Sequence, residues 1–165
     1  MSKRDKFHRL LDGVNGMYRK DKEKDYLYLA HPLDSRHIVR NWETRFEKGT
    51  GIDLLNPFYD TSERLIIKQI DMGVRDRYDV SPKQTVEKCI ECIEKGKGLV
   101  AIIDESKRSV GTKMEIPIAA RMGKPVYLLV TNGEEEHPWY KYYATGIAKS
   151  FKELEEMLVK KYGKK

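Results

Sequence analysis

Two short and almost wholly apolar runs, residues 99–103 and 126–130, constrain this chain more than any other feature. A polar loop from Asp104 and a segment of small apolar residues, which ends at Gly123, lie between them. Continuous apolar runs of this length are typical of strands that are covered on both faces of a parallel sheet. The stretch therefore predicts strand, loop, helix and strand, which is the repeating unit of α/β folds.

The same alternation extends through most of the chain. Further strands are predicted at residues 26–30, at 52–55 and, more weakly, near 143–148. Helices are predicted from Asp34 or Ser35 to about residue 51, from Thr61 or Ser62 to about residue 71, from Ser81 to residue 96, before Gly123, and over residues 151–162. Short connections between alternating elements predict one α/β domain over residues 26–165, with a doubly wound parallel sheet of about five strands and helices on both faces.

Residues 1–25 are predicted to be a separate N-terminal appendage. Phe7, Leu10, Leu11 and Val14 have the spacing of one face of a short amphipathic helix, and a charge run follows at residues 19–25. This appendage could pack on a neighbouring subunit.

Composition narrows the classes of partner. The length of 165 residues is enough for one hydrophobic core. The net charge of +6 favours anionic ligands. Nucleic acid is not an expected partner, because no aromatic-rich basic motif accompanies the charge. No run approaches the roughly 20 apolar residues that span a bilayer, and no signal-peptide core follows the N-terminus. We therefore expect a cytoplasmic protein without a membrane partner.

The two cysteines do not form a metal site. Cys89 and Cys92 lie about one turn apart within a predicted helix, and the four histidines are scattered without ligand spacing. Zinc would require two further ligands near the cysteine pair. The sequence predicts buried or half-buried thiols, no metal and no cofactor.

The loop after residues 99–103 has the residues of a ligand-binding loop. Open parallel sheets bind ligands at the carboxyl ends of their strands, which here are residues 30–32, 56–57 and 104–112. Ser109, Thr112 and the amides around Gly111 can hydrogen-bond an anionic or hydroxylated ligand. The Gly-Lys-Ser/Thr of a Walker loop is not present.

Glu115 is the candidate for chemistry in this loop. Proline is tolerated in the first turn of a helix, so Pro117 predicts that the helix begins within about one turn before it. Glu115 would then lie at the helix N-terminus, where the dipole favours the ionised carboxylate that a nucleophile requires. From the residues alone, the alternative is a first-turn glutamate that merely complements the dipole.

A family resemblance favours the first interpretation. The pattern Ser109-x-Gly111-x-x-Met114-Glu115-Ile116 resembles that of the nucleoside 2-deoxyribosyltransferase family and of its relatives, the deoxynucleoside 5′-monophosphate N-glycosidases. The similarity continues over Ala119, Ala120 and residues 123–126, and residues 28–32, with Tyr28, are similar to the first strand of that family. The resemblance implies a flavodoxin-like fold, a homo-oligomeric enzyme, and Glu115 as the nucleophile that attacks C1′ of the sugar.

The residue at position 109 indicates which substrate class to expect. In this family, the transferases carry an aspartate at the matching position, whereas the monophosphate hydrolases carry a serine. An aspartate would repel a phosphate, but a serine hydroxyl can donate to it, helped by Arg108 or Lys113 and by Ser35 and Arg36. We therefore expect hydrolysis of a nucleoside 5′-monophosphate, although Ser109 could also be a plain loop serine.

Other candidate residues could have either a substrate-binding role or a structural role. Tyr28 could stack on the base or pack in the core, and His31 could touch substrate or be a polar strand-end residue. Asp104 is included among the substrate-binding candidates as the first residue of the loop. Trp139 and Tyr140 could close a pocket, form an interface or lie on the surface.

One departure from the family weakens this assignment. The family carries an aspartate near the base, and an ungapped alignment places Cys89 there, where a neutral thiol cannot replace a carboxylate. Glu87, Glu91 or Asp79 could substitute for it. The alternatives are base exchange between nucleosides, a nucleotide-binding protein without turnover, and cleavage of an NAD-type glycoside.

Overall fold

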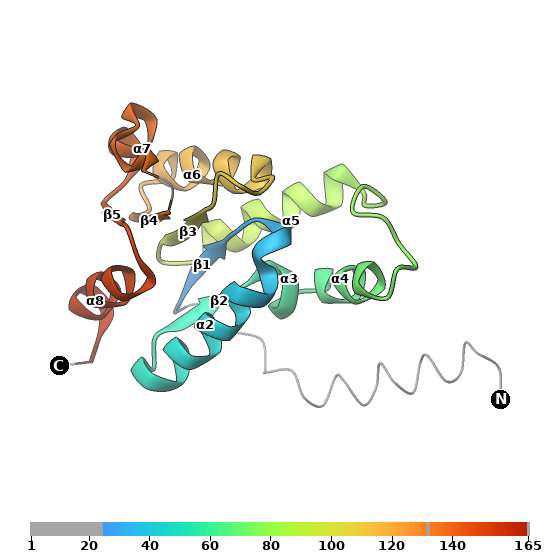
Figure 1. Ribbon diagram of the computed structural model, residues 1–165, viewed down its shortest axis with the longest axis horizontal. Helices are drawn as coiled ribbons and strands as arrows, with labels where there is room; N and C mark the ends of the chain where they lie inside the picture. Colours follow the sequence, from blue (N-terminus) through green and yellow to red (C-terminus); the bar gives the residue numbers. More distant parts are fainter. Residues whose placement is uncertain (1–24, 132, 165) are drawn as a thin grey trace.

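The computed structural model describes residues 25–131 and 133–164, and it contains one sheet of five parallel strands (Figure 1). The strands are β1 (Tyr26–Ala30), β2 (Asp53–Leu55), β3 (Leu99–Ile103), β4 (Val126–Val130) and β5 (Gly146–Ala148). Their order, β2-β1-β3-β4-β5, is that of flavodoxin-like doubly wound sheets. The predicted fold class is confirmed, while the appendage predicted for residues 1–25 lies outside the described residues except for Asp25.

Helices connect the strands. They are η1 (Leu33–Ser35), α2 (Arg36–Thr50), α3 (Pro57–Asp60), α4 (Glu63–Asp71), α5 (Pro82–Lys95), α6 (Val110–Arg121), η2 (Glu134–Glu136), α7 (Pro138–Tyr143) and α8 (Phe151–Tyr162). Gly51 ends α2 in the left-handed conformation, and the Ser81 side chain accepts a hydrogen bond from the Gln84 amide at the start of α5. Among the described helices, none combines the length and apolar character needed to cross a bilayer.

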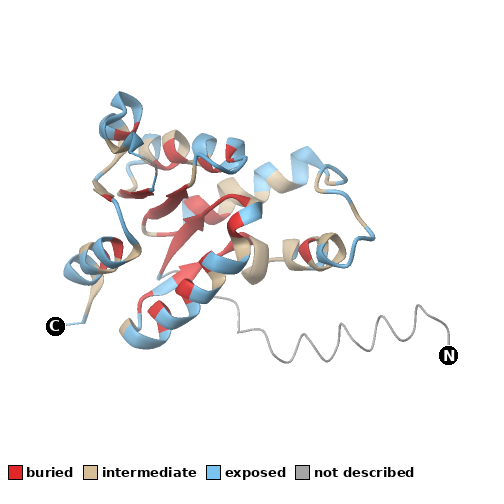
Figure 2. Cartoon of the chain, in the orientation of Figure 1, coloured by how far each residue is buried: buried red, intermediate tan, exposed pale blue. Residues whose placement is uncertain are grey.

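The sheet separates two apolar cores. Alternate residues of β1 point to opposite faces, so that Tyr26 and Tyr28 pack with α5 and α6, whereas Leu27 and Leu29 pack with α2 and α8. Figure 2 shows the buried strands between helices whose outer faces are exposed. The prediction of helices on both faces is confirmed.

Two apolar helix residues are exposed, and one strand is shorter than predicted. Ile38 is 68% exposed and Val86 is 53% exposed. Ile38 is one residue, or about 100° of helix rotation, from the buried Val39, and therefore faces solvent. Val86 lies in the first half of α5, whose buried residues are near its C-terminal end. Residues 138–143 form α7, so β5 takes only the end of the stretch predicted as a weak strand.

Candidate active site

The site lies where the strand order reverses. The chain leaves β1 for β2 on one side and returns to β3 on the other side of β1, so the loops after β1 and β3 diverge at the carboxyl edge. Such a divergence opens a crevice for ligands in doubly wound sheets. The loop after β1 leads into η1 and α2, and the loop after β3 leads into α6, which carries Glu115.

Three side chains from three elements meet at Glu115. The hydroxyl of Tyr28, which is fully buried in β1, donates a hydrogen bond of 2.7 Å to Oε1 of the Glu115 carboxylate. The Cys89 thiol on α5 packs against the same apolar core and interacts electrostatically with Glu115 and Tyr28. The half-buried carboxylate therefore has two neutral partners, one from the sheet and one from the adjacent helix.

Burial controls the charge of this cluster. It raises the pKa of Glu115 to about 7, while the hydrogen bond from Tyr28 and the interaction with the Cys89 thiol favour the charged form and act in the opposite direction. Burial, together with the negative charge of Glu115, raises the pKa of Cys89 to about 12 and the pKa of Tyr28 well above its usual range. Glu115 thus ionises near neutral pH, and its two partners stay protonated.

The predicted start of the helix that carries Glu115 is wrong. α6 begins at Val110, so Glu115 is its sixth residue and Pro117 lies inside the helix. Proline cannot donate to the carbonyl one turn before it, at a typical cost of about 3 kcal/mol, but the buried Ile116 and Ala119 hold this segment against the sheet. Because the helix dipole acts mainly on the first turn, it does not hold Glu115 ionised.

Ser109 marks the true start of α6. It is buried at the N-cap position, but its hydroxyl makes no capping hydrogen bond. Thr112 is also buried, whereas Gly111 is exposed with open space around its Cα. The first N–H groups of a helix have no intrahelical partner. The Ser109 hydroxyl and these amides can therefore serve an anion at the carboxyl edge.

His31 is a buried strand-end residue. Its Nδ1 lies 2.9 Å from the Pro32 carbonyl oxygen and its Nε2 lies 3.1 Å from Oδ1 of Asn56. Burial lowers the pKa of His31 to about 4. Both ring nitrogens thus face protein oxygens near the ends of β1 and β2, and the neutral ring, with one N–H, can donate to only one of them. Of the two roles left open by the sequence, this placement favours the structural one.

Arg36 and Asp104 are held by local contacts. Arg36 forms an ion pair with Asp71 and donates a hydrogen bond of 2.9 Å to the Leu33 carbonyl oxygen. Asp104 accepts hydrogen bonds from the amide and the hydroxyl of Ser106, at 3.0 and 2.6 Å. The structure therefore places these two predicted residues in the rim of the site rather than beside Glu115.

The charged loop at residues 72–81 reaches the same edge. Arg77 forms an ion pair of 2.5 Å with Asp34 in η1, and Arg108 donates a hydrogen bond of 2.8 Å to the Tyr78 hydroxyl. The hydrogen bond from Arg77, and the charges of Arg77, Arg36 and Lys107, lower the pKa of Asp34. Three cations therefore surround the Asp34 carboxylate at this edge. The arginine-rich sequence signalled this loop, but nothing in the sequence indicated where it docks.

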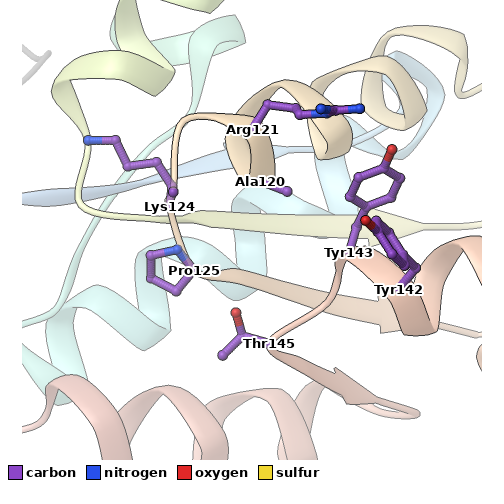
Figure 3. Close-up of a pocket in the computed structure, with 8 residues that line it drawn as sticks. Ala120, Arg121, Lys124, Pro125, Tyr142, Tyr143 and Thr145 are labelled. Carbon is purple, nitrogen blue, oxygen red and sulfur yellow. The ribbon is translucent and has the colours of Figure 1, made fainter.

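Two pockets beside α6 are lined by residues other than Glu115, Tyr28 and Cys89. One pocket, of about 480 Å³, lies between α6 and α7. There the buried Tyr140 donates a hydrogen bond of 2.9 Å to Glu105, and Trp139 is 66% exposed. The other, of about 550 Å³, lies where α6 ends and β4 begins (Figure 3). There Lys124 points away from Tyr142 and Tyr143, and its Nζ donates to the Glu94 and Gly96 carbonyls.

Solved structures share this architecture. A 2-deoxyribosyltransferase from Bacillus psychrosaccharolyticus aligns with 79% of this chain and 90% of its own, at 17% identity and a TM-score of 0.56. The chain has the fold of a 2-deoxyribosyltransferase. A CMP N-glycosidase from Clostridium botulinum aligns with 81% of this chain and 96% of its own, at 18% identity and a TM-score of 0.51. A conserved protein from Enterococcus faecalis aligns with 84% of this chain and 98% of its own, at 17% identity and a TM-score of 0.62.

The likeness is one of fold. At 17 to 18% identity, the shared 2-deoxyribosyltransferase fold does not transfer a substrate or a residue's role. Comparison of the sequence with protein-family models and with curated proteins finds no match.

Proposed function

We propose that the protein hydrolyses the N-glycosidic bond of a nucleoside 5′-monophosphate with Glu115 as the nucleophile. The observation that carries this proposal is the 2.7 Å hydrogen bond from Tyr28 to Glu115, on a carboxylate held beneath the reversal of strand order. A carboxylate fixed in such a site can attack an anomeric carbon. The shared fold with a 2-deoxyribosyltransferase and a CMP N-glycosidase supports the same chemistry.

The reaction has two steps. A carboxylate oxygen of Glu115 bonds to C1′ as the C1′–N bond breaks, and the base leaves with the bonding electrons and takes a proton from water. Water then attacks C1′, which releases the sugar 5-phosphate and restores the carboxylate. Both transition states resemble an oxocarbenium ion, which the negative charge of Glu115 stabilises. The Tyr28 hydroxyl holds the carboxylate in place during both steps.

Ser109 and the start of α6 are proposed to bind the 5′-phosphate. The Ser109 hydroxyl, which makes no capping bond, can donate to a phosphate oxygen together with first-turn amides of α6. Arg108 lies one residue earlier and bonds to a neutral phenol, so it can turn to a phosphate without abandoning a carboxylate. Lys113 differs, because it forms an ion pair of 2.9 Å with Glu105.

A chromatographic screen for released base tests the proposal. The full chain is incubated with nucleosides, nucleoside 5′-monophosphates and NAD, each with and without a second free base. We expect free base and sugar 5-phosphate from a monophosphate without any acceptor. A new nucleoside formed only when the second base is present would indicate a transferase instead. Nicotinamide released from NAD, or monophosphate binding by calorimetry without product, would each contradict the proposed hydrolysis.

Replacement of Ser109 by Asp should change substrate preference. A carboxylate at this position would repel a phosphate and remove a donor, so kcat/KM for the monophosphate should fall by about 100-fold. The same quantity for the corresponding nucleoside should change little. Ser109→Ala is the matched control and should lose about tenfold on the monophosphate alone, because it removes the donor without adding charge. An equal loss on both substrates would show that Ser109 does not face the phosphate.

A further inference from the structure

The pocket between α6 and α7 has an aromatic lining. Its volume of about 480 Å³ is within the range of small-molecule sites. The rings of His137 and Tyr140 have centroids 5.4 Å apart, and those of Trp139 and Tyr143 have centroids 6.1 Å apart. α6 adds the apolar side chains of Met114 and Pro117 to the lining. A ligand in this pocket would therefore contact ring faces and apolar groups.

Most polar groups of the lining are already paired with one another. The two oxygens of Glu105 accept hydrogen bonds of 2.9 Å from the Tyr140 hydroxyl and from the Lys113 ammonium group. Nδ1 of His137 accepts a hydrogen bond of 3.3 Å from the Trp139 amide, so this nitrogen carries no proton and the ring is neutral. These pairs leave the pocket few free partners for a ligand that requires many hydrogen bonds.

Glu134 gives the lining a net negative charge. It is the first of three consecutive glutamates, and the other two have lysine partners: Glu135 lies 3.4 Å from Lys149, and Glu136 lies 2.6 Å from Lys141. Glu134 lines the pocket instead, and no ion pair engages its carboxylate within the described part of the chain. The lining thus has the opposite sign to the whole chain, whose net charge is +6.

These features favour an organic cation over other ligands. The faces of aromatic rings attract cations, and the Glu134 carboxylate adds to this attraction. A quaternary ammonium group needs no hydrogen bonds, so the pairing of Glu105 with Tyr140 costs it nothing, whereas a primary ammonium would lose part of its hydration. A nucleotide phosphate would be repelled by Glu134.

We propose that the pocket between α6 and α7 binds a small quaternary ammonium compound, whose cationic head lies among the aromatic rings of α7 and beside the Glu134 carboxylate. This site is independent of the proposed hydrolysis, because Glu115 does not line the pocket.

The test is a proton–nitrogen NMR titration of the full chain with choline, at an ionic strength held constant with sodium chloride. The indole signal of Trp139, which is 66% exposed, reports on the pocket. The indole of Trp42, which is buried and donates a hydrogen bond of 2.8 Å to Glu155, is the internal reference. The neutral isostere of choline, in which carbon replaces nitrogen, is titrated in parallel. We expect choline to shift the Trp139 signal alone and to bind at least about tenfold more tightly than the isostere.

Two variants identify the groups that recognise the cation. Glu134→Gln should weaken choline binding by about threefold and leave the isostere unaffected, because it removes only the charge. Glu136→Gln is the matched control and should bind choline as the wild type does, since Glu136 does not line the pocket. Trp139→Ala should weaken choline binding by about tenfold, as read from the Tyr140 amide signal. Equal melting temperatures would show that the variants are folded.

Three results would overturn the proposal. The first is equal affinity for choline and its isostere, which would indicate an apolar pocket without preference for a cation. The second is an unshifted Trp139 signal at about 20 mM choline, a concentration well above the dissociation constant of even a weak site. The third is a Trp139 signal that moves with protein concentration and not with choline, which would show that a second copy of the chain covers the pocket.

Discussion

Replacement of Glu115 by Gln is expected to lower kcat for base release by at least about 1,000-fold. Glutamine has nearly the same shape and can still accept a hydrogen bond from Tyr28, but its amide cannot form the glycosyl ester. The measurement is chromatography of released base at pH 8, where the wild-type carboxylate is ionised because its pKa is about 7. Glu156→Gln is the matched control, since Glu156 is exposed on α8 and has no proposed role in the site.

A melting experiment separates lost chemistry from lost folding. Because the folded pKa of Glu115 is raised, the stability linked to its protonated form is present at low pH and is lost as pH rises through about 7. Glutamine cannot ionise, so the variant should melt at or above the wild-type temperature at pH 8 and close to it at pH 4. Retention of more than a tenth of the wild-type kcat in a folded variant would contradict the nucleophile assignment.

Replacement of Arg40 by Ala is expected to lower the free energy of unfolding by about 3 kcal/mol at pH 8. Glu43 is completely buried, and its two oxygens accept hydrogen bonds of 2.9 Å from Arg40 and from Asn56. Arg40 also lies 3.7 Å from Asp60. Its removal would leave a buried negative charge without its adjacent cation.

The pH dependence identifies the cause of this loss. Burial raises the pKa of Glu43 to about 7, so the carboxylate is protonated in the folded state well below neutrality. The stability cost of Arg40→Ala should therefore be largest above pH 7 and should shrink towards pH 5, as urea denaturation at both values would show. Arg45→Ala, which removes an exposed cation from the same helix, should cost little at either pH. An equal loss for Arg40→Ala at both pH values would exclude the charge of Glu43 as its source.

The fold could be predicted because its signals are local and repeated. Apolar runs at residues 99–103 and 126–130 correspond residue for residue to β3 and β4, and the Ser81-Pro82 pair starts α5 as expected. The start of α6 could not be predicted from Pro117, because packing against the sheet overrides the local preference of proline for a first turn. Local rules identified the helix, and tertiary contacts set its first residue.

The sequence singled out candidate residues for the site, but it could not indicate their contacts. The spacing from Ser109 to Glu115 singled out both residues, and the resemblance gave them roles that remain to be tested. The hydrogen bond from Tyr28 joins positions 87 residues apart, so no local pattern could reveal it. The contacts that engage His31 and Arg36 likewise come from Asn56 and Asp71, which lie far along the chain.

The position of Tyr28 within an interior strand links the Glu115 carboxylate to the stability of the whole domain. β1 pairs with β2 on one side and β3 on the other, and the Tyr28 amide donates 2.9 Å to the Gly98 carbonyl. Local fraying of surface loops leaves such a strand intact, and its amides exchange with solvent mainly through global opening. The Glu115 carboxylate is therefore held by a strand that we expect to open last, so that partial unfolding at the rim can change ligand access without releasing this carboxylate.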